Sequence, residues 1–119
     1  MFALSSSLNY YMYSEAADMR KGFDSLCGLI HTGLQGNPLS GDVFIFINKR
    51  RDSVKLLRWD DTGFILYYKR LEKGTFEIPL MKEGDGSCRL QWSQLVMMIE
   101  GISFKDVRHR KRFSFAGNC

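Results

Sequence analysis

The sequence of 119 residues contains few of the residues that form disulfide bonds or bind metal ions. It contains three cysteines, two histidines and two prolines. Cys27, Cys88 and Cys119 are odd in number and widely spaced, with no Cys-x-x-Cys pair among them. This spacing argues against a disulfide framework and against a zinc site. We therefore expect no metal ion and no other cofactor.

Long apolar runs and a charged leader are also missing. No stretch approaches the roughly 20 apolar residues that a membrane-spanning helix needs. Residues 1–13 read MFALSSSLNYYMY, which lacks the basic start and the long apolar centre of a secretory signal. We therefore expect a soluble cytoplasmic protein that does not contact a membrane.

Residue patterns typical of catalysis are absent from the linear sequence. His31 and His109 stand in no recognisable ligand or triad pattern, and the adjacent Asp60 and Asp61 precede Thr-Gly, as in a turn. No glycine-rich phosphate-binding loop is present, since the glycines near residue 36 lack a Lys-Ser/Thr partner. The sequence argues against an enzyme and against a small-molecule substrate. A divergent enzyme would need acidic residues that only the fold brings together.

Basic residues, in contrast, are abundant and unevenly placed. The net charge is +4. Residues 49–73 hold eight basic and four acidic side chains, and residues 105–112 hold five basic and one acidic, so each segment carries +4. The remainder of the chain therefore sums to −4. Two positive segments on a mildly acidic body favour a polyanionic partner, although ordinary solvated surface is the alternative.

The first half of the chain predicts a strand and a helix. Residues 8–13 are rich in aromatics and suit a short strand. Asp18 is a candidate N-cap for a helix that runs to about His31. The apolar residues that recur at the helical period predict its buried face: Met19, Phe23, Leu26, Cys27 and Ile30.

Three further strands are predicted at about 43–47, 53–59 and 64–69, joined by loops at 48–52 and 60–63. The first of these is apolar at every position, so we expect it to be covered on both faces. Residues 88–92 suit another short strand, and Ser93 is a candidate N-cap for a helix to Glu100 that ends at Gly101. The predicted fold is a small single α+β domain over residues 1–119, with a central antiparallel three-stranded meander and two helices packed on it. Its core covers about residues 8–104, and a basic tail covers 105–119.

If residues 53–59 form the central strand of the meander, the cations that end the next strand lie near the basic loop. Such a cluster would bind phosphates in a salt-dependent way, but nothing resembles a recognition helix that reads bases. Trp59 is as well suited to packing as to stacking on a base. The predicted nucleic-acid-binding residues are Lys49, Arg50, Arg51, Arg58, Lys69, Arg70 and Lys73, with Arg108, Arg110, Lys111 and Arg112 in the tail.

An ordered series of short motifs resembles a known family. The series comprises DMRKGFDSL from residue 18, GDVFIF from 41, NKRR from 48, YKRLEKG from 68 and EGI from 100. Together they resemble the TnpB accessory proteins of the bacterial insertion-sequence-sixty-six family, over about residues 8–104. These proteins are unrelated to the RNA-guided nuclease of the same name.

The resemblance implies a non-catalytic accessory role in DNA transposition, beside a separate transposase that cuts and joins the DNA. The implied partners are DNA (the element ends or non-specific duplex), the transposase and another accessory protein encoded by the element. The alternative is an adaptor that binds the transposase without contacting DNA. In that case the first predicted helix would supply the contact through Asp18, Arg20, Lys21 and Asp24, and the basic hairpin would only favour solubility.

Overall fold

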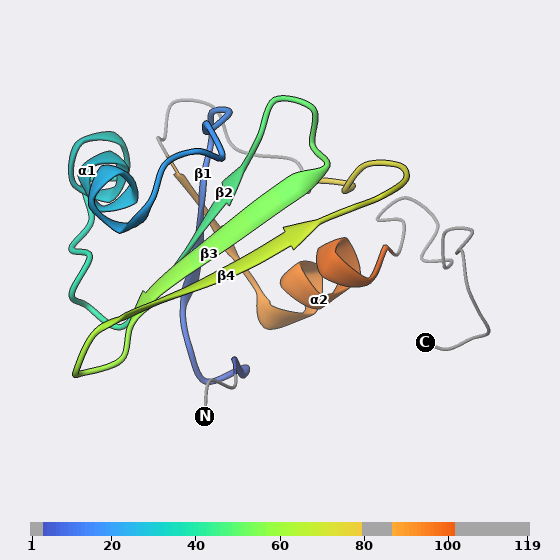
Figure 1. The fold of residues 1–119 in the computed structure, drawn as a ribbon. Coiled ribbons are helices and arrows are strands. Elements are labelled where there is room, and N and C mark those ends of the chain that lie inside the picture. The colour runs from blue at the N-terminus through green and yellow to red at the C-terminus, as the bar shows by residue number, and fades with distance from the viewer. Residues whose placement is uncertain (1–3, 80–86, 102–119) are drawn as a thin grey trace.

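Two helices pack on opposite faces of one five-stranded sheet (Figure 1). The computed structural model describes residues 4–79 and 87–101. The strand order across the sheet is β4-β3-β2-β1-β5. In chain order the elements are β1 (Tyr10–Tyr13), α1 (Phe23–Gly33), β2 (Val43–Ile47), β3 (Ser53–Trp59), β4 (Phe64–Arg70), β5 (Ser87–Leu90) and α2 (Trp92–Glu100).

The predicted meander is confirmed, but it is only part of the sheet. Strand β3 pairs antiparallel with both β2 and β4. Strand β1 adds to β2 in parallel, and β5 adds to β1 in antiparallel register. The prediction of three central strands was therefore incomplete. A parallel pair needs a crossover connection, here the one that carries α1, and such distant pairing leaves no local mark in the sequence.

Strand β2 lies at the centre of two hydrophobic cores. All five of its side chains are buried. Val43, Ile45 and Ile47 face the core beneath α2, whereas Phe44 and Phe46 face the core beneath α1. This confirms the prediction of a strand covered on both faces. Full burial of each such side chain contributes about 1.5–3 kcal/mol to stability, so β2 is a major part of the hydrophobic stabilisation.

Helix α1 begins four residues later than a cap at Asp18 would place it. The residue at its N-cap position is Gly22, which offers no side-chain cap. The Asp18 carboxylate instead accepts hydrogen bonds from the backbone and guanidinium of Arg20, which makes a separate turn. The buried face is set by Leu26 and Ile30, while Phe23 at the start of the helix is 45% exposed. The predictions of an Asp18 cap and a buried Phe23 were wrong, because a local Asp–Arg turn competes with the helix for the same carboxylate.

Helix α2 also begins at a different residue from the one predicted. Its N-cap is Gln91, and Ser93 is already inside the helix. The side chain of Gln94 reaches back to accept from the Gln91 backbone N–H at 2.9 Å, as part of a reciprocal capping box. The predicted end is confirmed, since Gly101 closes the helix with a left-handed φ of 82°. Within the described residues, neither helix combines the length and apolarity needed to cross a bilayer.

Candidate nucleic-acid interface

The loop between β2 and β3 holds three consecutive exposed cations on a well-bonded turn. The side-chain oxygen of Asn48 accepts hydrogen bonds from the backbone N–H groups of Asp52 and Ser53, at 3.1 and 3.0 Å. The Asn48 amide donates to the Asp52 carboxylate at 2.7 Å, and this bond is the main reason that the pKa of Asp52 is lowered. The turn holds the backbone of Lys49, Arg50 and Arg51 in place and leaves their side chains in solvent.

The end of β4 and the segment after it lie beside this loop. Arg70 is opposite Ser53 in the β3–β4 register. The chain then follows the loop, because Leu71 donates to the Asp52 carbonyl and Phe76 donates to the Arg51 carbonyl, both at 2.7 Å. The structure thus brings six of the predicted cations to one end of the sheet, which we call the basic end: Lys49, Arg50, Arg51, Lys69, Arg70 and Lys73.

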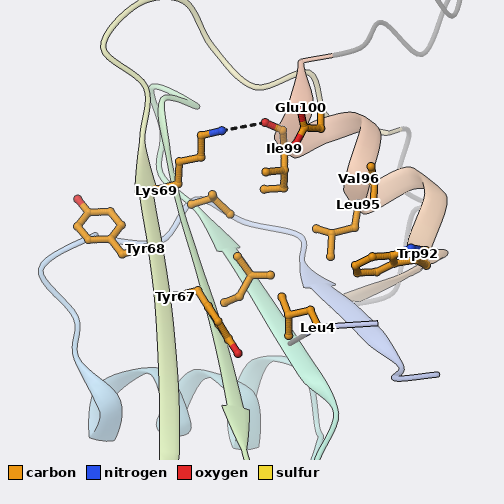
Figure 2. A pocket seen from close by; sticks show the side chains of 11 residues that line it. Leu4, Tyr67, Tyr68, Lys69, Trp92, Leu95, Val96, Ile99 and Glu100 are labelled. Atoms are coloured by element: carbon orange, nitrogen blue, oxygen red, sulfur yellow. Dashed lines mark hydrogen bonds between the residues drawn. The ribbon is translucent and has the colours of Figure 1, made fainter. Parts of the chain in front are cut away.

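The two cations that end β4 face opposite sides of the sheet. The Lys69 ammonium donates to the carbonyl oxygen of Ile99 at 3.1 Å, across to the last turn of α2 (Figure 2). Arg70 lies on the α1 side, and its guanidinium is 3.6 Å from the carboxylate of Glu72. Both of these side chains are well exposed, so the ion pair contributes little to stability.

Arg58 does not join the basic end. It lies opposite Val43 in the β2–β3 register, at the far end of β3 from the loop. It is five positions from Ser53 along the strand, which corresponds to about 17 Å. Its Nε donates to the carbonyl of Gly41 at 3.2 Å, and the side chain is half-buried. The predicted tail residues Arg108, Arg110, Lys111 and Arg112 lie outside the described residues.

The residues predicted to contact a protein partner are in the turn before α1, not on the helix itself, except for Asp24. A buried lysine fixes this turn to the sheet. Lys55 is only 7% exposed, and its ammonium donates to the carbonyls of Met19 and Lys21, at 2.7 and 2.8 Å. The alternation of side chains along β3 places Lys55 on the same face as Leu57. The sequence did not predict that Lys55 is buried, because a lysine in a strand is ordinarily solvated.

Arg20 and Asp18 form a close ion pair within this turn. The guanidinium Nη2 lies 2.7 Å from the Asp18 carboxylate, and Nε contacts both carboxylate oxygens at 3.1 Å. Hydrogen bonds from the Arg20 side chain, followed by the one from its backbone, lower the pKa of Asp18 to about 2. The pair is well exposed, so its effect is to fix the shape of the turn and present Arg20 outward.

The aromatic residues of β3 and β4 differ in how much surface they offer. Trp59 is half-buried, and its ring meets the edge of Phe64 at a centroid distance of 5.0 Å. Tyr67 is half-buried and packs against the core beneath α2. Tyr68 points to the other face and is 53% exposed. Of these aromatic residues, Tyr68 therefore offers the most surface to a ligand, although the sequence analysis gave it no role.

An apolar cavity of about 390 Å³ lies between α2 and the sheet (Figure 2). The residues that line it include Val54, Leu56, Tyr67, Trp92 and Leu95. Lys69 and Glu100 supply polar groups among the residues that line it. Within the described residues, no three histidine, cysteine or acidic side chains come close enough to hold a metal ion. The site thus combines exposed cations and an apolar hollow.

Comparisons with known proteins place the chain in a family. The family described as "IS66 Orf2 like protein" (TnpB of IS66) matches residues 8–109. Two similar relatives come from Sinorhizobium fredii (strain NBRC 101917 / NGR234). "Uncharacterized protein y4jC" is 30% identical over 110 residues, or 92% of each chain. "Uncharacterized protein y4hO" is 35% identical over 88 residues, or 74% of this chain and 75% of the relative. No solved structure matches the chain. The match over residues 8–109 shows that the chain belongs to the IS66 Orf2-like TnpB family, which is associated with DNA transposition.

Proposed function

We propose that this protein is a non-catalytic accessory factor of DNA transposition, and that it binds the DNA backbone through the basic end of its sheet. The observation that carries the proposal is the convergence of six exposed cations from the β2–β3 loop and the end of β4. Each phosphate that such a cluster neutralises releases condensed counterions, which favours binding at low salt.

Backbone contact fits this site better than base reading. The basic end consists of loops and a strand end, and the last turn of α2, which Lys69 contacts, carries no basic side chain. Phosphate contacts position a protein without reading sequence, whereas specificity needs bidentate contacts to base edges. We therefore expect an affinity for duplex DNA that depends strongly on salt and weakly on sequence.

The test is a fluorescence-anisotropy titration of labelled duplex DNA at several salt concentrations. The element's terminal repeats and a scrambled duplex of equal length serve as ligands. The triple variant K49Q/R50Q/R51Q removes three cations from one loop. If each contacts one phosphate, the slope of log K against log salt becomes shallower by about 2–3. Binding of the wild type that is independent of salt would rule out the proposal.

A matched control separates the basic end from net charge alone. Arg50→Gln and Arg89→Gln each remove one positive charge, but Arg89 lies on β5, at the opposite edge of the sheet from β4. We expect Arg50→Gln to weaken binding and Arg89→Gln to leave it nearly unchanged. Equal losses from the two variants would show that binding follows overall charge and has no defined site.

The adaptor alternative has its own structural support. Lys55 fixes the turn at 18–21 to the sheet, so Arg20 and Lys21 project from a backbone of defined shape, as a protein contact requires. The test is a pull-down of the element's purified transposase in the presence of nuclease. Capture that survives nuclease and is lost in Arg20→Glu, combined with no DNA binding by the purified protein, would favour the adaptor.

A further inference from the structure

Tyr68 is an exposed aromatic residue among the cations of the basic end. It lies on the edge strand β4, next to Lys69 and two residues before Arg70. Because side chains alternate along a strand, Tyr68 and Arg70 face the same side of the sheet. At 53% exposure, its ring is among the most exposed large apolar side chains of the described residues. An aromatic ring of this kind beside several cations needs an explanation.

The ring rests on a fixed support. Lys55, its cross-strand neighbour on β3, places its ammonium 5.0 Å from the centre of the Tyr68 ring. That ammonium is held by the carbonyls of Met19 and Lys21, so it cannot move away without breaking two hydrogen bonds. One side of the ring therefore meets a buried cation, and the exposed part of the ring is available to another flat group.

Cations lie on both sides of the ring, on the turn at 18–21 and at the end of β4. The turn at 18–21 lies next to the Lys55 ammonium and carries the exposed side chain of Arg20. Two acids are paired with these cations: Asp18 with Arg20, and Glu72 with Arg70. A strand of nucleic acid that crosses this face would therefore meet cations on both sides of the ring.

We propose that Tyr68 is a stacking platform for an unpaired base, and that the basic end accordingly favours single-stranded DNA over an intact duplex. This inference rests on the proposed function, because it concerns the same surface. Stacking on aromatic rings combined with a basic track is the usual way in which proteins hold single strands. In a duplex the bases are already stacked on each other, so no base face is available for stacking on the Tyr68 ring.

The competing explanation is that Tyr68 only covers the Lys55 ammonium. An apolar side chain of similar reach would serve that role, whereas base stacking needs a flat ring. Tyr68→Leu keeps apolar cover and removes the ring, and Tyr68→Phe keeps the ring. Comparison of these two variants distinguishes base stacking from apolar cover of the Lys55 ammonium, even if Tyr68→Ala destabilises the protein.

The experiment measures affinity for a labelled 15-nucleotide single strand and for the matched duplex, at one salt concentration. We expect Tyr68→Leu and Tyr68→Ala to weaken single-strand binding by about fivefold or more and to change duplex binding by less than about twofold. Tyr68→Phe retains the wild-type preference. A 2-aminopurine base within the single strand reports stacking directly, through fluorescence quenching that Tyr68→Leu abolishes. Phe23→Ala serves as the control. Phe23 is comparably exposed, but its neighbours in sequence are Gly22 and Asp24, neither of which is a cation.

The outcomes distinguish this inference from the function on which it rests. If the wild type binds neither ligand, the proposed function fails. If it binds both equally and Tyr68→Leu changes nothing, the stacking platform is refuted while backbone binding stands. If Phe23→Ala weakens single-strand binding as much as Tyr68→Leu does, the effect is a general one of apolar surface and Tyr68 has no special role.

Discussion

The ammonium of Lys55 donates a hydrogen bond of 2.7 Å to the carbonyl oxygen of Met19, 36 residues earlier in the chain. A second bond of 2.8 Å goes to the carbonyl of Lys21. These bonds fix the segment before α1 onto β3, where no strand pairing reaches it. Because a buried ammonium without acceptors is costly, the same bonds that hold the turn also make the burial of Lys55 tolerable.

Lys55→Met should therefore loosen the turn at 18–21. The substitution keeps the length and apolar stem of the side chain but removes the donor. We expect the free energy of unfolding to fall by about 1–3 kcal/mol, since hydrogen bonds from a charged group are lost. Hydrogen exchange of the Lys21 amide, which donates to Asp18 at 3.0 Å, should become faster.

Lys69→Met is the matched control for this experiment. Lys69 lies on the neighbouring strand and also donates to a carbonyl, but its side chain is exposed. We expect the free energy of unfolding of the Lys69→Met variant to differ from that of the wild type by less than about 0.5 kcal/mol, as at most surface positions. Equal stability of wild type and Lys55→Met would show that the Lys55 bonds do not hold the turn.

The core beneath α1 should be sensitive to truncation of Leu26. This side chain is fully buried in the cluster that includes Phe44 and Phe46. Leu26→Ala should lower the free energy of unfolding by about 2–5 kcal/mol, through lost burial and the cavity left behind. Leu39 is the same residue type at 55% exposure, so Leu39→Ala should change stability by less than about 0.5 kcal/mol. Urea denaturation measures both, and a similar loss in the two variants would contradict this packing.

Two glycines of α1 should respond to alanine with opposite signs. A Cβ added at Gly28 meets nothing within 4 Å, so Gly28→Ala should stabilise the protein by about 1 kcal/mol through better helix propensity. A Cβ at Gly33 would lie 2.7 Å from Cε1 of the Tyr13 ring. Gly33→Ala should destabilise by about 1–3 kcal/mol, because the half-buried Tyr13 ring, which packs on Phe46, must shift. Thermal unfolding of the two variants provides the comparison.

The Asp18 carboxylate should titrate near pH 2 and should depend on Arg20. The hydrogen bonds from Arg20 favour the charged carboxylate, and they lower its pKa from the ordinary 3.8 to about 2. A lowered folded-state pKa stabilises the fold above the ordinary value, and this stabilisation is lost as the pH falls from about 4 through about 2. In Arg20→Gln the Asp18 pKa should rise toward 3.8. Carboxyl NMR titration measures it, and an unchanged pKa in the variant would contradict the assigned cause.

Much of the fold could be predicted from local patterns. The unbroken apolar run of β2 predicted two covered faces, and the turn residues at 48–52 and 60–63 predicted both hairpins. The start of α1 could not be predicted, because an aspartate can cap a helix or close a local turn, and the Lys55 bonds that hold this turn come from a residue far along the chain. The position of β1 between β2 and β5 could not be predicted either, since both pairings join segments that are distant in sequence.

The candidate site also has features that could be predicted from the sequence and features that could not. The convergence of the β2–β3 loop with Lys69 and Arg70 followed from hairpin register alone, and the structure shows it. The register could also have excluded Arg58 from this group, since it lies at the other end of the strand. The exposure of Tyr68 had no such signal, because alternation along a strand tells which face a side chain takes but not whether a helix covers that face.

The position of β1 in the sheet affects how the chain can fold while it is being synthesised. The hairpins of β2, β3 and β4 join neighbouring segments, so they can close soon after they are synthesised. Strand β1 is made before the three hairpin strands, yet its second partner, β5, is made after them. Until β5 emerges, one edge of β1 has its backbone hydrogen-bonding groups open to any other strand, including that of a second nascent chain. Strand β1 is therefore exposed to mispairing until β5 is made, and a slow codon before β5 would prolong that exposure.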